Sequence, residues 1–307
     1  MILFASERSL DRAENIKAVY DRYDGDKQFL RLYGRDNEGI TSGGYKLMVT
    51  DECPRSSPGK VLVVNHGVNG IKTYGLNMEN PYLTKEECGL LTCALASSKD
   101  MVGLVASEYN LDESKVYPYG LPRTDAYFGK KKGDGNTFLK DKRAYLFAPT
   151  YRRPMEGEMP KIDWDVIDSM LTDDEILVVK PHMNTGRILH HDRNHIIEIF
   201  NSFPSTPFLI DCDVLITDYS SIMFDAQILG KPVILFEKDC RYRDVHKMYM
   251  NYPWDYSSKY CTDEITLVNL LRTAQFDETD KRCRNHVAGA CDGHSTDRVI
   301  ELIRSMI

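Results

Sequence analysis

Short apolar runs alternate along this chain with segments in which apolar residues recur at helical spacing. Runs rich in valine, leucine and isoleucine are typical of buried strands, and they occur at 1–6, 59–67, 90–94, 143–150, 175–183, 213–217 and 232–238. Two further segments, 27–34 and 44–52, alternate between apolar and polar residues as half-buried strands do. Helical spacing follows at 9–23, 97–110, 163–171, within 190–201, from 221 to 229 and at 292–307. Strands that alternate with helices predict parallel sheets with helices on both faces.

A polar, glycine-containing segment at 129–142, "GKKKGDGNTFLKDK", interrupts this alternation. The strand–helix pattern restarts at residue 143, and a chain of 307 residues is long enough for two domains. We therefore expect two α/β domains, one over 1–135 and one over 136–307. Because parallel sheets bind ligands at the carboxyl ends of their strands, two such domains facing each other predict a binding cleft.

Composition and charge narrow the classes of protein to consider. The net charge of −7 and the sequence pI of about 5.7 indicate no basic face for nucleic acid. The N-terminal segment turns polar at Ser6 and no apolar run is long enough to cross a bilayer, so we expect neither a signal peptide nor a spanning helix. The eight cysteines form no CxxC pair, which favours reduced cytosolic thiols. The histidine-rich run at 190–195 has no cysteines at zinc spacing, and we interpret it as the surface of a helix.

Polar residues directly follow five of the predicted buried strands. They lie at 65–67, 149–153, 180–182, 218–221 and 237–239. Cations, imidazoles and hydroxyls predominate among them, and these are the groups that bind an anionic substrate. Since they fall where an α/β sheet places its ligands, they predict a site for an anion at the strand ends.

Each of these groups also has a purely structural interpretation. A histidine at a strand end can be a packing or turn residue, and Lys180 can extend its ammonium group out of the strand end. Ser220 and Ser221 can cap the helix that runs to Leu229, an interaction worth about 1 kcal/mol. A helix N-terminus also binds anions, so a cap and a phosphate site are compatible. The P-loop and dinucleotide-binding glycine patterns are absent from the sequence.

Six motifs in one order carry a resemblance to a known family. They are "NHGVNGIK" (65–72), "YGLPRTDAYF" (119–128), "FAPTYRR" (147–153), "VVKPH" (178–182), "LITDYSSIMFDAQILGKPVILF" (215–236) and "DGHSTDRVIELI" (292–303). They resemble the CDP-glycerol glycerophosphotransferases of teichoic-acid and capsule synthesis, which include relatives that use CDP-ribitol. The resemblance runs from about residue 60 to the last residues, while residues 1–58 share only the strand–helix–strand pattern. The family commonly has Trp before its His-Gly pair, where this chain has Asn65.

The resemblance implies a GT-B fold, in which two Rossmann-like domains hold the active site between them. It also implies that glycerol phosphate, or a related polyol phosphate, moves from CDP-glycerol to a hydroxyl of a cell-surface glycan or teichoic-acid or capsule acceptor, with release of CMP. Transfer in this family is independent of metal, so we expect no metal and no cofactor besides the donor substrate.

This chemistry requires a base for the hydroxyl and positive charge for the pyrophosphate. His66, on the first domain, is the expected base, because an imidazole accepts a proton near neutral pH. His182 and Lys180 are expected at the donor phosphates on the second domain. Ser220 and Ser221 would complete this cradle together with the amides of their helix.

Asp218 is expected to brace the loop, because a carboxylate and a phosphate repel each other. The predicted catalytic residues are His66 and His182. The predicted substrate-binding residues are Gly67, Lys72, Arg123, Thr150, Arg152, Lys180, Asp218, Ser220, Ser221 and Asp239.

The expected partners are a CDP-polyol donor and a glycan or lipid-linked polymer acceptor, without nucleic acid. The expected location is the cytoplasm, with peripheral contact to the inner face of the membrane, because the chain shows neither a spanning helix nor a strongly basic amphipathic helix.

Two other classes of function remain open at the level of sequence. One is a GT-B glycosyltransferase or epimerase that uses a UDP-sugar, for which Glu237 is the acid near a strand end that could bind the sugar nucleotide. Release of UDP rather than CMP would identify it. The other is a non-catalytic nucleotide-binding subunit of capsule assembly, which the presence of both histidines disfavours and which turnover would exclude.

Overall fold

The computed structural model describes residues 1–32, 40, 44–152, 161–189, 191 and 193–307, which form two compact units. The first unit comprises Met1–Phe128 and Asn285–Ile307, and the second comprises Gly129–Arg284. The first border lies close to the one predicted between 135 and 136. The return of residues 285–307 to the first unit differs from the prediction, which placed the whole of 136–307 in the second domain.

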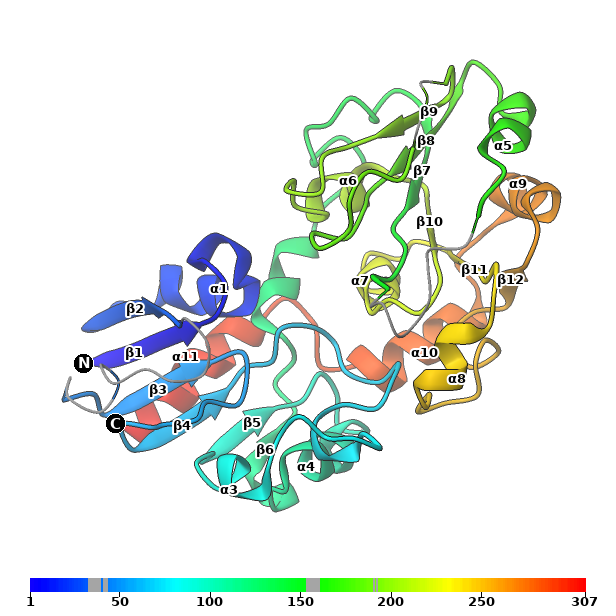
Figure 1. Ribbon diagram of the computed structural model, residues 1–307. Helices are drawn as coiled ribbons and strands as arrows, with labels where there is room; N and C mark the ends of the chain where they lie inside the picture. Colours follow the sequence, from blue (N-terminus) through cyan, green and yellow to red (C-terminus); the bar gives the residue numbers. More distant parts are fainter. Residues whose placement is uncertain (33–39, 41–43, 153–160, 190, 192) are drawn as a thin grey trace. The chain divides into compact units, whose positions relative to one another are not determined.

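The first unit is built on a six-stranded parallel sheet (Figure 1). Its spatial order is β2-β1-β3-β4-β5-β6, so the chain changes direction across the sheet between β1 and β3. In open α/β sheets, ligands bind at such a switch point, outside the carboxyl ends of the strands. The strands are β1 (Ile2–Ser6), β2 (Lys27–Arg31), β3 (Leu47–Thr50), β4 (Lys60–Val63), β5 (Cys93–Leu95) and β6 (Val116–Tyr117).

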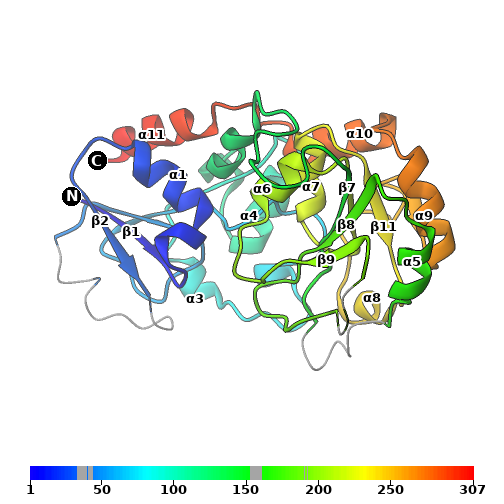
Figure 2. The same ribbon diagram turned by 90° about the horizontal axis from the view of Figure 1, so that it is seen from above.

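Helices α1 (Glu14–Arg22) and α11 (Ser295–Met306) share one core with this sheet (Figures 1 and 2). The apolar side of α11 explains why residues 285–307 belong here, because burying it against α1 and the sheet removes apolar area from water. Periodicity predicts the amphipathic helix but not the sheet that it covers. Helix α4 (Val102–Tyr109) packs against β5 and β6, and the short α3 (Lys85–Cys88) precedes β5. The shared core includes Phe4, Ile16, Val19, Val49, Leu62, Val299 and Ile303.

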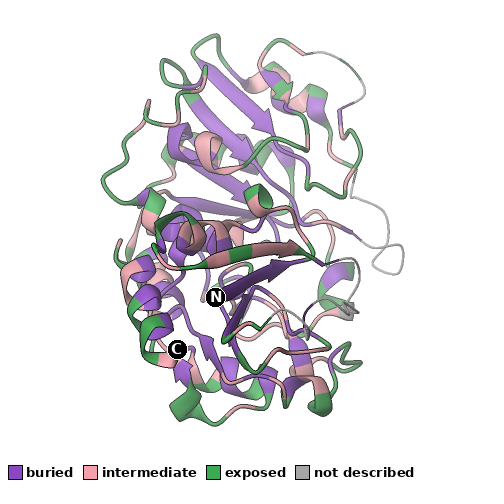
Figure 3. Ribbon diagram, turned by 90° about the vertical axis from the view of Figure 1, so that its left-hand side faces the viewer, coloured by how far each residue is buried: buried purple, intermediate pink, exposed green. Residues whose placement is uncertain are grey.

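The second unit holds another six-stranded parallel sheet, in the order β12-β11-β10-β7-β8-β9. Its switch point lies between β7 and β10, the first and fourth strands of the unit. The strands of both sheets are largely buried, whereas the edge strands β2 and β9 are only partly so (Figure 3). The strands of this second sheet are β7 (Arg143–Phe147), β8 (Glu175–Val179), β9 (Ile196–Glu198), β10 (Val214–Thr217), β11 (Val233–Phe236) and β12 (Lys259–Cys261).

Helices α5 (Trp164–Met170) and α9 (Glu264–Thr273) form a core with one face of the second sheet. This core contains Phe147, Trp164, Ile167, Leu177, Ile216, Ile234, Leu267 and Leu271. The remaining helices are α6 (Thr206–Asp211), α7 (Ile222–Ile228), α8 (Arg241–Val245) and α10 (Glu278–Ala288). Among the helices of the described residues, none has the length and apolar character that crossing a bilayer requires.

The helix predicted within 190–201 is wrong, because this segment forms the edge strand β9. The Leu177 amide donates to the His195 carbonyl, and the Ile199 amide donates to the Val179 carbonyl. Ile196 and Ile197 are β-branched, and such residues favour a strand when a neighbouring strand is present to pair with. Of the predicted histidine-rich helix face, residues 190 and 192 lie outside the described residues.

Candidate active site

The switch point of the second unit brings two of the predicted polar segments into contact. The segment after β7 carries Thr150 and Arg152, and the segment after β10 begins with Asp218. The Thr150 amide donates to Asp218 Oδ1 at 2.8 Å, and Arg152 Nη2 donates to Asp218 Oδ2 at 2.7 Å. The two loops on either side of the switch point are thus joined by a carboxylate.

Asp218 is buried and its carboxylate is used within the protein. Besides the bonds from the β7 loop, Oδ1 accepts from the Tyr219 amide at 2.7 Å. The side chains of Arg152 and Asp218 are only 3% and 7% exposed, so this is a buried ion pair. The Arg152 guanidinium also lies over the rings of Tyr242 and Tyr219, at 4.6 Å and 5.3 Å from their centroids. These contacts show Asp218 bracing the loops.

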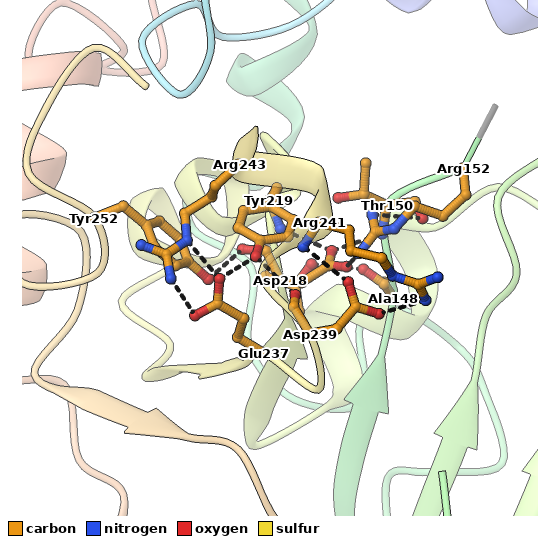
Figure 4. A network of polar contacts seen from close by, with 11 residues as sticks. Ala148, Thr150, Arg152, Asp218, Tyr219, Glu237, Asp239, Arg241, Arg243 and Tyr252 are labelled. Carbon is orange, nitrogen blue, oxygen red and sulfur yellow. Dashed lines mark hydrogen bonds and ion pairs between the residues drawn. The ribbon is translucent and has the colours of Figure 1, made fainter. Parts of the chain in front are cut away.

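Glu237, directly after β11, is the centre of a second buried network (Figure 4). Its carboxylate accepts from the Tyr219 and Tyr260 hydroxyls and from Arg243, at 2.6 Å from Nε and 3.1 Å from Nη2. Burial, followed by the hydrogen bond to Glu237, raises the pKa of Tyr219 well above its ordinary value, so the phenol is a neutral donor. The Glu237 carboxylate, which the UDP-sugar alternative would use to bind the sugar nucleotide, therefore already has hydrogen-bond donors within the protein.

The aromatic part of these networks was missed by the sequence reading. The rings of Tyr219 and Tyr242 stack at 4.8 Å, and Tyr219 lies 5.0 Å from Tyr252. The Tyr252 hydroxyl donates to the Asp218 carbonyl at 3.2 Å. These residues lie on three segments of the sequence with no common pattern, so only the folded chain reveals their association.

Ser220 and Ser221 begin the turn into α7 and are half-buried. Within the described part of the chain, the Ser221 hydroxyl makes no capping hydrogen bond to the helix. The Ser220 hydroxyl lies 3.5 Å from the Ile222 amide, at the limit of a hydrogen bond. The geometry therefore gives the pure capping interpretation little support.

A small pocket opens beside these loops, at the carboxyl ends of β7, β10 and β11. Two cations and one acid join its mainly apolar walls. Its lining residues are Phe147, Pro149, Arg152, Ile162, Asp218, Phe236 and Lys238.

The residues after β8 divide into a buried and an exposed group. Lys180 is 5% exposed, and its Nζ donates to the carbonyls of Pro181 at 2.8 Å and Asn201 at 3.1 Å. His182 is exposed; its ring stacks on Tyr151 at 5.4 Å, and Nδ1 accepts from the Asn184 amide at 3.2 Å. The ammonium group of Lys180 thus anchors backbone in this structure, whereas the imidazole of His182 faces solvent.

Asp239, which follows Glu237 on the loop after β11, is joined to the same region through its backbone. Its carbonyl accepts from the Tyr219 hydroxyl at 3.1 Å. Its carboxylate accepts from the amide and Nη2 of Arg241, at 3.1 Å and 3.0 Å (Figure 4).

In the first unit, His66 and Gly67 follow β4 near the switch point of that sheet. Desolvation by surrounding protein, and then the positive charges of Arg8, Arg123 and Lys72, lower the pKa of His66 from 6.5 to about 3. His66 is nevertheless an exposed residue, so its desolvation is incomplete. The direction of the shift keeps the imidazole neutral at pH 7, with a ring nitrogen free to accept a proton, and it also makes the ring a weaker base than a free imidazole.

Arg123 is held close to this histidine by the helix α1. Its amide donates to Asn15 Oδ1 at 2.9 Å, while its side chain reaches Glu14 at 3.4 Å and the Tyr127 hydroxyl at 3.2 Å. Arg123 and Lys72, which the sequence predicted only as substrate-binding residues, thus lie near enough to His66 to act on its charge.

A further charged group at this switch point was missed by the sequence reading. Arg8, after β1, pairs with Asp51 at 2.9 Å and with Glu52 at 3.1 Å, both after β3. Ser6 donates to Asp51 at 3.0 Å. Burial raises the pKa of Asp51 despite the opposing charge of Arg8. A search for polar residues at the ends of the predicted strands 1–6 and 44–52, as made for the five buried strands, would have found all four residues.

Among the described residues, no group of three or more histidine, cysteine, aspartate or glutamate side chains is arranged to hold a metal ion.

Two Rossmann-like units with polar loops at their switch points define a protein of the GT-B fold class, as the sequence predicted. Residues 46–305 match the CDP-glycerol:poly(glycerophosphate) glycerophosphotransferase family, and the chain belongs to that family.

Relatives and solved structures agree with this assignment. The chain is 26% identical to the teichoic acid poly(ribitol-phosphate) polymerase of Bacillus spizizenii over 98% of its own length and 56% of that protein. It is 24% identical to the teichoic acid glycerol-phosphate primase of Bacillus subtilis, over 85% of this chain and 72% of that one. The chain thus spans little more than half of the first of these proteins.

The fold is shared with the wall teichoic acid polymerase TagF, at a TM-score of 0.77 and 19% identity over 99% of this chain and 88% of that one. It is also shared with the UDP-GlcNAc 2-epimerase of Neisseria meningitidis, at a TM-score of 0.59 and 12% identity over 99% and 100% of the two chains. At these identities the likeness concerns the fold alone.

Proposed function

We propose that the protein transfers glycerol phosphate, or a related polyol phosphate, from CDP-glycerol to a hydroxyl of a teichoic-acid, capsule or other cell-surface glycan acceptor. Family membership supports this proposal, and the teichoic acid polymerases and primases among the relatives are enzymes of this type. The observation that carries it is the joining of the β7 and β10 loops at the switch point, beside the half-buried Ser220 and Ser221.

In the proposed reaction, the acceptor oxygen bonds to the phosphorus that carries glycerol, and the pyrophosphate bond to CMP breaks. The hydroxyl proton passes to His66, whose neutral ring can accept it. Arg123 and Lys72 stabilise negative charge near His66. Gly67 allows the acceptor to approach the backbone beside it.

The second unit binds the donor in this proposal. The hydroxyls of Ser220 and Ser221 and the amides at the start of α7 donate hydrogen bonds to the phosphates, and His182 donates to them from its exposed position. Thr150 and Asp239 contribute from the neighbouring loops, while Arg152 and Asp218 hold these loops together. Lys180 acts through the backbone that its ammonium group anchors.

A UDP-sugar reaction is less well supported. The acid that such a reaction would use, Glu237, already accepts from Tyr219, Tyr260 and Arg243. A ribose would have to displace buried, charge-assisted bonds to reach it.

Transfer without a metal or cofactor is part of the proposal, since the cations and helix amides can neutralise the pyrophosphate directly. So is a cytoplasmic location with peripheral contact to the inner face of the membrane, where a lipid-linked acceptor would be presented.

The proposal is tested by incubating the full chain with CDP-glycerol, CDP-ribitol and UDP-sugars, each with and without a glycan acceptor. Acceptor-dependent release of CMP is the expected result. Release of UDP, or nucleotide binding without any turnover, would replace the proposal with one of the two other classes of function.

A further inference from the structure

We propose that Asn65 is a positioning residue that fixes the orientation of the His66 imidazole. The inference rests on the proposed function of His66 as the base. It concerns the residue at which this chain departs from the Trp common in the family.

Asn65 is 4% exposed and is bound to three elements of the first unit. Its Nδ2 donates to the Leu95 carbonyl of β5 at 2.9 Å, and its Oδ1 accepts from the Tyr109 hydroxyl of α4 at 2.7 Å. Its carbonyl accepts from Asn15 Nδ2 of α1 at 2.8 Å. The carbonyl of Asn65, which belongs to the peptide leading into His66, is therefore tied to α1, and its side chain is tied to α4 and to the neighbouring strand β5.

The backbone at this position restricts the choice of residue further. Asn65 has a φ of 56°, in the left-handed region that asparagine tolerates better than most residues. Glycine would adopt this φ but would supply neither hydrogen bond. Aspartate would keep the acceptor for Tyr109 and would place a carboxylate oxygen against the Leu95 carbonyl. Asparagine supplies the conformation, the donor and the acceptor together.

Tyr109 supports His66 by a second route, through aromatic contacts. Its ring lies 6.1 Å from the ring of Tyr74, which lies 5.9 Å from the imidazole of His66. The hydroxyl of Tyr109 therefore holds the side chain of Asn65, and its ring supports Tyr74, which packs against the imidazole.

The loop that carries His66 and Tyr74 is also drawn against α4 by its own residues. Asn69 Nδ2 donates to Glu108 at 2.5 Å. A Cβ at Gly75 would lie 2.4 Å from the Glu108 carbonyl oxygen, so only glycine allows this approach. Within the described residues, no hydrogen bond to the His66 ring is found, and the ring depends on this packing for its orientation.

Two variants and a matched control test the inference in the full chain. Asn65→Gly keeps the left-handed backbone and removes both side-chain bonds, and Tyr109→Phe removes one hydroxyl and keeps the ring. Asn110→Gly is the control, since Asn110 also has a left-handed φ, of 51°, but is exposed at the end of α4. The readouts are kcat and KM for CDP-glycerol, and the NMR signal of the His66 ring, assigned with His66→Ala.

Asn65→Gly should lower kcat about tenfold to a hundredfold, the scale expected when a reacting group is misplaced by roughly 1 Å. KM for CDP-glycerol should change less than about twofold, because the donor is assigned to the second unit. Tyr109→Phe should lower kcat by a smaller factor, and both variants should shift or broaden the His66 signal. Asn110→Gly should leave both readouts unchanged.

A folded Asn65→Gly protein with wild-type kcat and an unchanged His66 signal would overturn the inference, as would an equal effect of Asn110→Gly. If Asn65→Gly does not fold, Tyr109→Phe decides by the same measurements. If the wild-type chain releases no CMP, the proposed function fails, while the His66 signal still decides whether Asn65 positions the ring.

Discussion

The buried ion pair of Arg152 and Asp218 should make a large contribution to the stability of the second unit. Asp218→Asn keeps one oxygen for the amides of Thr150 and Tyr219 but removes the charge that faces Arg152. Arg152 is only 3% exposed at its side chain, so its guanidinium would stay buried without a counter-charge. Breaking such a pair typically costs about 3–5 kcal/mol of folding free energy. We expect a loss of about 3 kcal/mol, at the low end, because Arg152 keeps its contacts with the rings of Tyr219 and Tyr242 and faces an amide oxygen.

The assay is urea unfolding followed by tryptophan fluorescence. The chain has two tryptophans, Trp164 and Trp254, and both lie in the second unit. Asp165→Asn serves as the matched control, because it removes the partner of Arg193 at 2.9 Å in the same unit, where Asp165 is 85% exposed. Asp165 itself is solvated, although the Arg193 side chain is only 10% exposed, and pairs with an exposed partner are worth about 0–1 kcal/mol.

The two substitutions thus make the same chemical change at a buried and at an exposed aspartate. Equal losses of stability in Asp218→Asn and Asp165→Asn would refute the reasoning. The double variant Asp218→Ala with Arg152→Met should regain part of the loss, because no unpaired charge then remains in the interior.

Three other predictions concern the chemistry. His66→Ala should lower turnover about 10²–10⁴-fold and leave CDP-glycerol binding nearly intact by calorimetry. His182→Ala should instead weaken donor binding by about 1.5–3 kcal/mol. Full activity of His66→Ala would show that His66 is not the base. Activity should survive excess EDTA, and a complete loss that magnesium restores would refute transfer without metal. Because desolvation, and then the charges of Arg8, Arg123 and Lys72, lower the pKa of His66 from 6.5 to about 3, its ring should remain neutral as the pH falls from 7 to 5. An NMR titration midpoint near 6 would contradict this account of the desolvation and charge around His66.

Much of the fold follows from local pattern. The buried strands β4, β7, β8, β10 and β11 lie within the predicted apolar runs, because a run of valine and leucine bounded by polar residues specifies a central parallel strand directly. The strand β9 was mistaken for a helix, since its extended form depends on pairing with β8 rather than on its own periodicity. The placement of α11 in the first unit depends likewise on a contact made across nearly the whole chain.

The candidate site shows the same division. Asp218 and Thr150 could be placed at strand ends from the sequence, but their direct bond depends on β7 and β10 being neighbours at the switch point. The partners of Glu237 lie 6 to 23 residues away. No motif joins Tyr219, Arg243 and Tyr260, so the occupied state of this acid could be learned only from the structure.

The two units share an arrangement of buried and accessible residues after one of their central strands. In each unit the first polar residue beyond the strand is buried and held by several hydrogen bonds: Asn65 after β4 and Asp218 after β10. Residues shortly after them are more accessible to solvent: His66 directly after Asn65, and Ser220 after the buried Tyr219. Buried polar groups are nearly always hydrogen-bonded, and the several bonds of Asn65 and Asp218 fix the backbone around them. Substitution of the buried residue should therefore disturb stability and alignment together, whereas substitution of its accessible neighbour should remove chemistry at little cost in stability.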